Sequence, residues 1–280
     1  MGGTGRSWVR LCGALGIIAS FACHASGAIV SKNLGDIWFI GDSITQSNSD
    51  GDANGSPRKS LFDKLTAGGY TFGYTGHTTL NTDGLTGAAY TSHSGISGST
   101  IGANTGGRQD MTAGIPGWWT TGLLLTNKPN VILIMLGTND INSNINIATA
   151  PSRMTTLVDT IFAQSGIGNP TVMIATIPPN RISTTTQTNV AAFNAALPGI
   201  VSGLRGTGKD VYLIDQFTPI NDLYATAMRP DNLHPNALGN DLIGQTWFNA
   251  IQAMAVPEPS AFVLPIVLGA TCLVVRLRRR

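Results

Sequence analysis

Residues 37–47 have the sequence IWFIGDSITQS, in which an apolar run stops abruptly at Gly41-Asp42-Ser43. An aromatic and β-branched run that ends in glycine and small polar residues is typical of a buried strand. In open α/β sheets, ligands bind at the carboxyl ends of the strands. The stretch therefore predicts a strand that delivers Ser43 to that edge. A turn without chemistry is the competing interpretation, since all three residues are common in turns.

Further apolar runs along the chain have the length of buried strands, and helical patterns lie between several of them. The predicted strands are Ile37–Ile40, Tyr70–Tyr74, Val131–Leu136, Thr171–Ile177 and Val211–Ile214. The predicted helices are Ser60–Ala67, Pro151–Ala163, Thr188–Val201 and Asn236–Met254. Alternation of strand and helix predicts a doubly wound α/β sheet with helices on both faces, in one domain without internal repeats.

The composition suits one globular domain with a sizeable core, because 42% of the 280 residues are hydrophobic and only 11% are charged. Six of the 17 basic residues lie close to the two ends of the chain. Residues 28–255 contain 11 Lys and Arg against 14 Asp, which gives a net charge of about −3. This balance leaves no basic surface for a nucleic acid.

The first 27 residues have the three parts of a secretory signal peptide. Arg6 and Arg10 form a basic start, an apolar middle follows, and the small residues Ala25-Ser26-Gly27-Ala28 resemble a cleavage region. The alternative, a buried first helix, fits this arrangement less well. We therefore expect residues 1–27 to be removed on export.

The last 25 residues also have the pattern of a targeting segment. Val256-Pro-Glu-Pro-Ser260 precedes the apolar run Ala261–Val275, and the chain ends in an arginine cluster, residues 276–280. This order resembles the PEP-CTERM sorting signal of Gram-negative bacteria that produce exopolysaccharide. The resemblance implies transient anchoring in the inner membrane, recognition by an exosortase, and export to the outer surface or matrix. A simple C-terminal membrane anchor is the alternative.

Cysteine and glutamate are both missing from residues 28–255. Cys12, Cys23 and Cys272 fall in the two terminal segments, so the domain has no disulfide, no thiol catalyst and no Cys-ligated zinc. The only glutamate is Glu258, which excludes a Glu-based glycosidase and a zinc protease with a His-Glu motif.

Two long polar stretches interrupt the alternation. Asp50–Gly55 matches the first half of a calcium loop, but Leu61 occupies the position that needs a bidentate glutamate, so a surface loop is the better interpretation. Gly76–Arg108 is rich in Gly, Ser and Thr and contains His77 and His93. A loop region of this length is usually functional.

The third histidine of the domain, His234, lies in Asp231-Asn-Leu-His-Pro235. The three histidines lack the spacing of metal ligands, so we expect no metal site. A serine nucleophile needs a base, and the base needs an anionic partner that fixes its tautomer. His234 and Asp231 can be that pair for Ser43. Alternatively, Asp231 is a turn residue and His234 an exposed loop histidine.

Two more segments supply candidate hydrogen-bond donors to a tetrahedral intermediate. Asn139 follows the apolar run Val131–Leu136 in Gly137-Thr-Asn-Asp140, and its side-chain amide can stabilise a negative oxygen. Gly95 in Ser92-His-Ser-Gly can bring a backbone N–H close to a ligand. An Asx turn is the alternative for Asn139.

Together, Gly41-Asp-Ser-Ile-Thr45, Gly95, Gly137-Thr-Asn-Asp140 and Asp231-Asn-Leu-His-Pro235 resemble the four ordered blocks of the SGNH (GDSL-type) hydrolases. The likeness covers roughly residues 35–253 and implies a three-layer α/β/α sandwich around a flavodoxin-like, five-stranded parallel sheet. It implies Ser43 as nucleophile, His234 as base and Asp231 as its orienting partner. The oxyanion hole would comprise the Ser43 and Gly95 N–H groups and the Asn139 amide, with Gly98 as the rival to Gly95. The family needs no cofactor.

Within that family the chain is similar to carbohydrate esterase family 3, on Gly-Asp-Ser-Ile-Thr, Ser-His-Ser-Gly, Ala191-Ala-Phe-Asn194 and Leu-His-Pro-Asn236. This implies an acetyl esterase that acts on acylated polysaccharide. Trp118 and Trp119 are candidates for stacking on sugar, and core aromatics are the alternative. A lipase, lysophospholipase or thioesterase with the same residues remains an alternative, as does a surface binding protein with a relic site.

Overall fold

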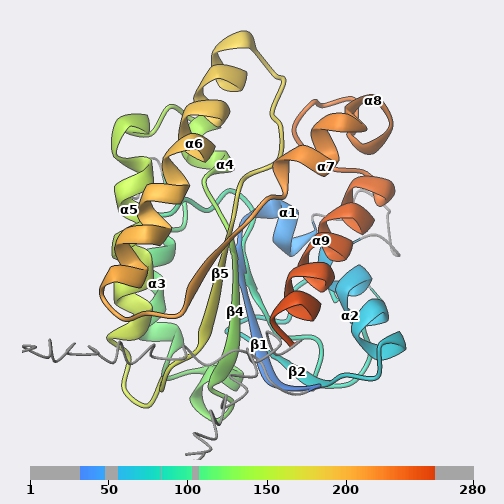
Figure 1. The fold of residues 1–280 in the computed structure, drawn as a ribbon, viewed down its shortest axis with the longest axis vertical. Helices are drawn as coiled ribbons and strands as arrows, with labels where there is room; N and C mark the ends of the chain where they lie inside the picture. Colours follow the sequence, from blue (N-terminus) through green and yellow to red (C-terminus); the bar gives the residue numbers. More distant parts are fainter. Residues whose placement is uncertain (1–31, 48–55, 83, 103–106, 256–280) are drawn as a thin grey trace, which may run out of the picture.

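The computed structural model describes residues 32–47, 56–82, 84–102 and 107–255 (Figure 1). The predicted signal peptide (1–27), the sorting segment (256–280) and the partial calcium loop (50–55) lie outside the described residues. Within the described ranges, no helix combines the length and the apolar character needed to cross a membrane.

The strands form one sheet in which every pairing is parallel. They are β1 (Asn33–Gly41), β2 (Thr71–Thr75), β3 (Ser94–Gly95), β4 (Pro129–Met135), β5 (Thr171–Ala175) and β6 (Val211–Ile214). The order across the sheet is β2-β1-β4-β5-β6. The short β3 pairs with the carboxyl end of β1, at Ile40 and Gly41, where the pairing with β2 has already ended. Because all strands run the same way, their carboxyl ends share one edge, which is the edge predicted to carry Ser43.

Helices cover both faces of this sheet. The α-helices are α1 (Ser43–Gln46), α2 (Pro57–Ala67), α3 (Met111–Trp118), α4 (Thr138–Asn142), α5 (Ala150–Phe162), α6 (Thr184–Gly206), α7 (Phe217–Asp222), α8 (Tyr224–Ala227) and α9 (Ala237–Ala255). Two short 3₁₀ turns are η1 (Gly122–Leu125) and η2 (Ile147–Thr149). Figure 1 shows α3, α5 and α6 on one side of the sheet and α2 and α9 on the other.

The alternation of side chains along β1 explains the two layers. Trp38 and Ile40 point into the core under α3, α5 and α6, whereas Ile37 and Phe39 point into the core under α2 and α9. All four side chains are at most 2% exposed. A parallel strand that is buried on both faces needs this continuous apolar run. The predicted α/β/α sandwich is therefore confirmed.

The five predicted strands and four predicted helices are all present, with shifted ends. The sixth strand, β3, has only two residues, which is too short for a periodic signal. Helix α6 begins at Thr184 rather than Thr188, because Ser183 and Thr186 form a capping box in a threonine-rich stretch that resembles a loop.

Candidate active site

The turn after β1 places Ser43 at the first position of α1. The Asp42 carboxylate accepts a hydrogen bond from the Ile44 N–H (3.0 Å) and so caps this helix. Gly41 leaves no room for a side chain: a Cβ would collide with the Thr45 side chain and lie 2.9 Å from the Met135 carbonyl oxygen. The turn is therefore tightly packed, and Ser43 is 8% exposed at its tip.

The structure brings Ser43, His234 and Asp231 into one chain of hydrogen bonds. Ser43 Oγ lies 3.0 Å from His234 Nε2, and His234 Nδ1 lies 2.7 Å from Asp231 Oδ2. Ser43 and His234 are 191 residues apart in sequence. With a proton on Nδ1, the ring donates to Asp231 and presents the lone pair of Nε2 to the serine hydroxyl.

The second oxygen of Asp231 holds the segment in its shape. Oδ1 accepts from the backbone N–H groups of Leu233 and His234, each at 2.9 Å. Partial burial raises the pKa of Asp231, but these two backbone donors and the His234 side chain outweigh it and hold that pKa below its usual value. Asp231 therefore stays anionic at neutral pH.

Backbone contacts fix the segment that carries this pair. Met228 and Pro235 form an antiparallel bridge, and the Arg229 N–H donates to the His234 carbonyl (2.9 Å). Asn232 takes a positive φ of 59°, which asparagine tolerates better than most residues. The segment is thus a closed loop between α8 and α9 (Figure 1).

Asn139 lies in the first turn of α4, after β4, which is the neighbour of β1 in the sheet. It is 7% exposed, and one N–H of its amide donates to the Ser99 carbonyl (3.0 Å). A carboxamide nitrogen has two protons, so this bond orients the group and leaves a second donor.

Gly95 lies in β3 beside Gly41, but its N–H is already engaged. It donates to His93 Nδ1 at 3.0 Å, so the donor assigned to the oxyanion from the sequence has an internal acceptor. Gly98 lies in the next turn with φ of 77°, where glycine is favoured, and its N–H has no acceptor among the described residues. Of the two glycines considered, Gly98 has the available donor.

His93 links two parts of the polar stretch 76–108 by hydrogen bonds. It had no role predicted from the sequence other than its place in Ser92-His-Ser-Gly95. It is fully buried, its Nδ1 accepts from Gly95, and its Nε2 donates to the Leu80 carbonyl (2.6 Å). Burial, helped by the positive charge of Arg58, lowers the pKa of His93 to about 3. The ring is therefore neutral in a fixed tautomer. A histidine before a Gly-rich stretch is too weak a sequence signal to reveal this.

Asp42, which precedes Ser43 in the chain, is a buried carboxyl group. It is 1% exposed, and its Oδ2 has no hydrogen-bond partner among the described residues. Burial raises the pKa of Asp42 to about 6, although the Ile44 N–H, Thr138 and His234 act in the opposite direction.

The two tryptophans proposed for sugar stacking have different environments. Trp119 is 3% exposed, packs against Trp38, and has the Lys128 ammonium 3.9 Å from its ring centre, so it is a core residue. Trp118 is half-buried and stacks on His77 at 4.0 Å. One face of the Trp118 ring is therefore covered by His77, and the buried Trp119 is not available to stack on a sugar.

A cavity of about 10 Å³ adjoins Ser43 and His234, and Ile44, Arg229 and Asn240 contribute to its wall. It has room for a group about the size of one water molecule. In the part of the chain that the structure describes, no three His, Cys, Asp or Glu side chains are grouped so as to hold a metal ion.

Comparison with known proteins gives one family and a set of related folds. Residues 39–242 match the model of the GDSL-like Lipase/Acylhydrolase family. Among curated proteins, none matches this chain.

Similar solved structures include a family 3 carbohydrate esterase from Clostridium thermocellum, which is 24% identical with a TM-score of 0.59 over 79% of this chain and 99% of that chain. A family 3 carbohydrate esterase from Talaromyces cellulolyticus is 21% identical, with a TM-score of 0.60 over 80% and 100% of the two chains. A catalytic mutant of an acetylxylan esterase from Geobacillus stearothermophilus is 16% identical, with a TM-score of 0.53 over 78% and 94%. At these identities the likeness shows a shared fold.

Proposed function

Because the chain belongs to the GDSL-like lipase/acylhydrolase family and is a carboxylic ester hydrolase, we propose that it is an exported serine esterase for short acyl groups on polysaccharide. The observation that carries the proposal is the hydrogen-bonded chain from Ser43 through His234 to Asp231, with distances of 3.0 and 2.7 Å. Those lengths are within the range for a nucleophile, its base and an orienting carboxylate.

In the first half-reaction, Ser43 Oγ attacks the ester carbonyl carbon while His234 Nε2 takes the serine proton. The tetrahedral intermediate collapses when His234 gives this proton to the leaving sugar oxygen, and an acyl-Ser43 ester remains. In the second half-reaction, water attacks that ester with His234 again as base, which releases the carboxylic acid and restores Ser43. Asp231 stabilises the imidazolium in both halves.

Three donors serve the oxyanion in this proposal. The Ser43 N–H is the first of α1 and has no acceptor within the helix. The free N–H of the Asn139 amide is the second. We assign the third to Gly98 in place of Gly95, because the Gly95 N–H is bonded to His93. Donors that are fixed before the reaction stabilise the developing charge without reorganisation.

A short acyl group is supported by the small cavity of about 10 Å³ beside Ser43 and His234. A long acyl chain needs an extended apolar pocket, and the residues that line this cavity include Ser47, Arg229 and Asn240. The similar structures include family 3 carbohydrate esterases and an acetylxylan esterase, which supports acetyl groups on a polysaccharide as the substrate.

Export rests on the two terminal segments. We infer export from the predicted signal peptide, residues 1–27, and the predicted sorting segment, residues 256–280. The sorting segment implies an exosortase as partner. Mass mapping of the protein from its native cells should find a start near Ala28 and no residues beyond the Pro-Glu-Pro motif. A full-length chain in the cytoplasm would contradict this part.

The catalytic proposal is tested with purified protein, by the release of acetate from acetylated xylan and by the hydrolysis of 4-nitrophenyl acetate. We expect Ser43→Ala to lower kcat/KM by roughly 10³-fold or more on both substrates. Ser202→Ala, a change of the same kind at an exposed position of α6 that does not line the cavity, is the control and should retain wild-type activity. Unchanged activity in Ser43→Ala would refute the proposal, and a preference for long-chain esters would favour a lipase.

A further inference from the structure

A second cavity, of about 150 Å³, lies between the segment that follows β5, the first turns of α6, and α7. We call it the α6–α7 pocket. Its polar wall consists of the carboxamides of Asn180, Gln187 and Asn221 and the guanidinium of Arg181. Its apolar wall includes Phe217 and Val190, and no carboxylate lines it. Drug-sized ligands need roughly 300 Å³ or more, so the pocket is suited to a single small ring.

One buried donor in this wall lacks a partner. Asn180 is only 1% exposed, and its Oδ1 accepts from the Ile182 N–H at 3.1 Å. Its Nδ2 has no acceptor among the described residues. Buried amide donors are nearly always satisfied, so an orphan in the wall of a cavity points to an acceptor that a ligand supplies.

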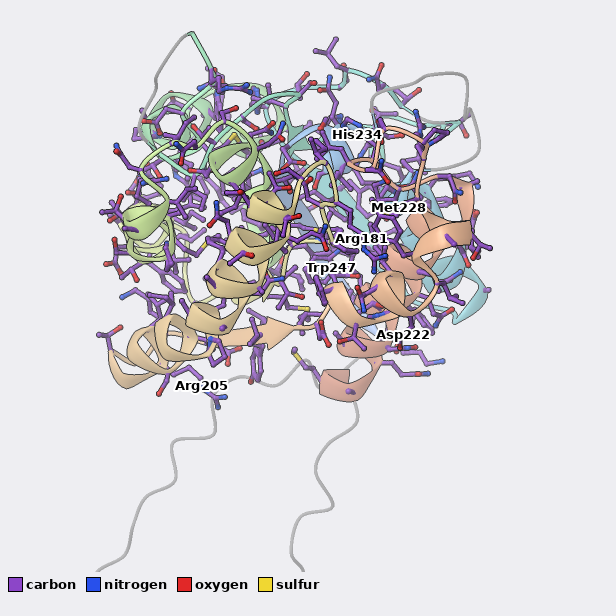
Figure 2. All side chains as sticks on the ribbon, turned by 90° about the horizontal axis from the view of Figure 1, so that it is seen from above. Arg181, Arg205, Asp222, Met228, His234 and Trp247 are labelled. Atoms are coloured by element: carbon purple, nitrogen blue, oxygen red, sulfur yellow. The ribbon has the colours of Figure 1, made fainter. Side chains whose placement is uncertain are left out.

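Arg181 links the pocket to the segment that carries the catalytic histidine. Its backbone N–H donates to the Asn232 carbonyl (3.1 Å), and its guanidinium lies 3.8 Å from the ring centre of Tyr224. The Tyr224 hydroxyl contacts the Asn232 side chain at 3.1 Å. In the view of Figure 2, Arg205 near the other end of α6 lies well apart from Arg181 and His234.

The pocket also shares the sheet edge that carries Ser43. The segment 176–183 follows β5, and Phe217 follows β6, whereas Ser43 follows β1. β5 is the second strand from β1 in the sheet, and neighbouring strands lie about 4.8 Å apart, so the two sites are separated by roughly 10 Å or a little more. A substrate with several sugar units can span that distance while its ester is at Ser43.

We propose that the α6–α7 pocket binds one neutral sugar ring of the polysaccharide, a few units along the chain from the acylated unit; this inference rests on the proposed function. Carboxamides both donate and accept, as sugar hydroxyls do, and the Phe217 ring offers an apolar surface to the C–H face of a sugar. The Arg181 guanidinium already donates to the side-chain oxygen Oδ1 of Asn221 (3.0 Å) and lies over the Tyr224 ring, so it acts as a fixed donor.

Two variants test the pocket kinetically. Gln187→Ala removes an exposed carboxamide from α6, and Asn180→Asp keeps the acceptor for Ile182 while it removes the orphan donor. For each, kcat/KM is measured on partially acetylated xylo-oligosaccharides and on 4-nitrophenyl acetate, which is too small to reach the pocket. We expect the ratio of kcat/KM on the oligosaccharide to kcat/KM on 4-nitrophenyl acetate to fall by about 5- to 20-fold. The main cause would be a higher KM for the oligosaccharide.

The matched control is Thr185→Ala, which changes an exposed residue two positions away on α6 that does not line the pocket. Its ratio should equal that of the wild type. Equal ratios in all four proteins, or the same loss in the control, would overturn the proposal.

A binding measurement separates this inference from the catalytic proposal. Titration calorimetry with unacetylated xylo-oligosaccharides, carried out in the Ser43→Ala background, needs no catalysis. Binding that weakens about 5- to 20-fold on adding Gln187→Ala supports the pocket even if Ser43 proves not to be the nucleophile. Binding that is unaffected by Gln187→Ala and by Asn180→Asp would refute it.

Discussion

The two oxygens of the Asp231 carboxylate have different partners. The isosteric change Asp231→Asn can therefore separate the structural role of one oxygen from the proposed catalytic role of the other. Oδ1 holds the turn through two backbone N–H groups, and Oδ2 accepts the proton of His234 Nδ1. In Asp231→Asn the retained oxygen preserves the turn, but an amide group faces Nδ1 and favours the opposite tautomer. We expect kcat to fall by about 10³-fold or more, with the thermal midpoint nearly unchanged.

Asp222→Asn is the matched control for this change, since Asp222 is an exposed carboxylate on α7 without a catalytic role. It should retain wild-type kcat on 4-nitrophenyl acetate. If Asp231→Asn were equally active, the carboxylate would be a turn residue only, which is the simpler alternative that the sequence left open.

Asn139 permits a second test at the residue scale. Asn139→Ala removes the amide that we propose as an oxyanion donor, so the transition state would lose a hydrogen bond that the ground state uses less. We expect kcat on 4-nitrophenyl acetate to fall about 100-fold while KM changes little. Asn142→Ala, at an exposed position of the same helix α4, should be neutral. A loss confined to KM would argue against an oxyanion role.

The sequence predicted these side chains because each follows a recognisable boundary: Ser43 and Asn139 end apolar runs, and Asp231 and His234 are three residues apart. It did not predict which glycine of the block has a free N–H. That choice depends on His93, whose ring turns back to accept from Gly95 two residues later. Burial keeps His93 neutral, and burial is a property of the folded chain.

At the scale of elements, α6 contains a test of helix stability remote from the site. Gly203 is exposed in the interior of α6, and an added Cβ there would meet no atom within 4 Å. Gly203→Ala should raise the free energy of unfolding by about 0.5–1 kcal/mol, because alanine loses less backbone entropy than glycine. The thermal midpoint should rise by about 1–4 °C with activity unchanged. A lower midpoint would contradict the open environment described for this position.

At Gly41, by contrast, a substitution should destabilise the protein, because a side chain there would fill the space that the turn between β1 and α1 needs.

Helices such as α5 were predictable because their apolar residues recur with helical spacing between clear boundaries. Helix α3 was not, because Gly114 and Pro116 interrupt the pattern within eight residues. Its place is set by tertiary packing, through Met111 and Ile115 against the core that contains Trp38. Local propensity carries little information about such an element.

The whole fold buries the carboxyl group of Asp42 beside Ser43, and this burial makes the stability of the protein depend on pH. Burial raises the pKa of Asp42 to about 6, so the folded state binds a proton more tightly than the unfolded chain between about pH 4 and pH 6. The contribution of Asp42 to stability therefore falls as the pH rises through that window. Asp215, Asp231 and Asp241 have lowered pKa values despite partial burial, because hydrogen bonds outweigh it, and their stabilisation is lost only at lower pH.

Asp42→Asn isolates this effect. Asparagine can still cap α1 through its carbonyl oxygen, but it has no charge to bury. We expect the difference in unfolding free energy between variant and wild type to rise from near zero at pH 4 to as much as about 3 kcal/mol in favour of the variant at pH 7.5. Urea denaturation at both pH values measures it. Other carboxyl groups, including the buried Asp140, are present in both proteins and cancel in the difference. A difference that did not change with pH would mean that Asp42 is ionised throughout, with a cation or donor that compensates its burial.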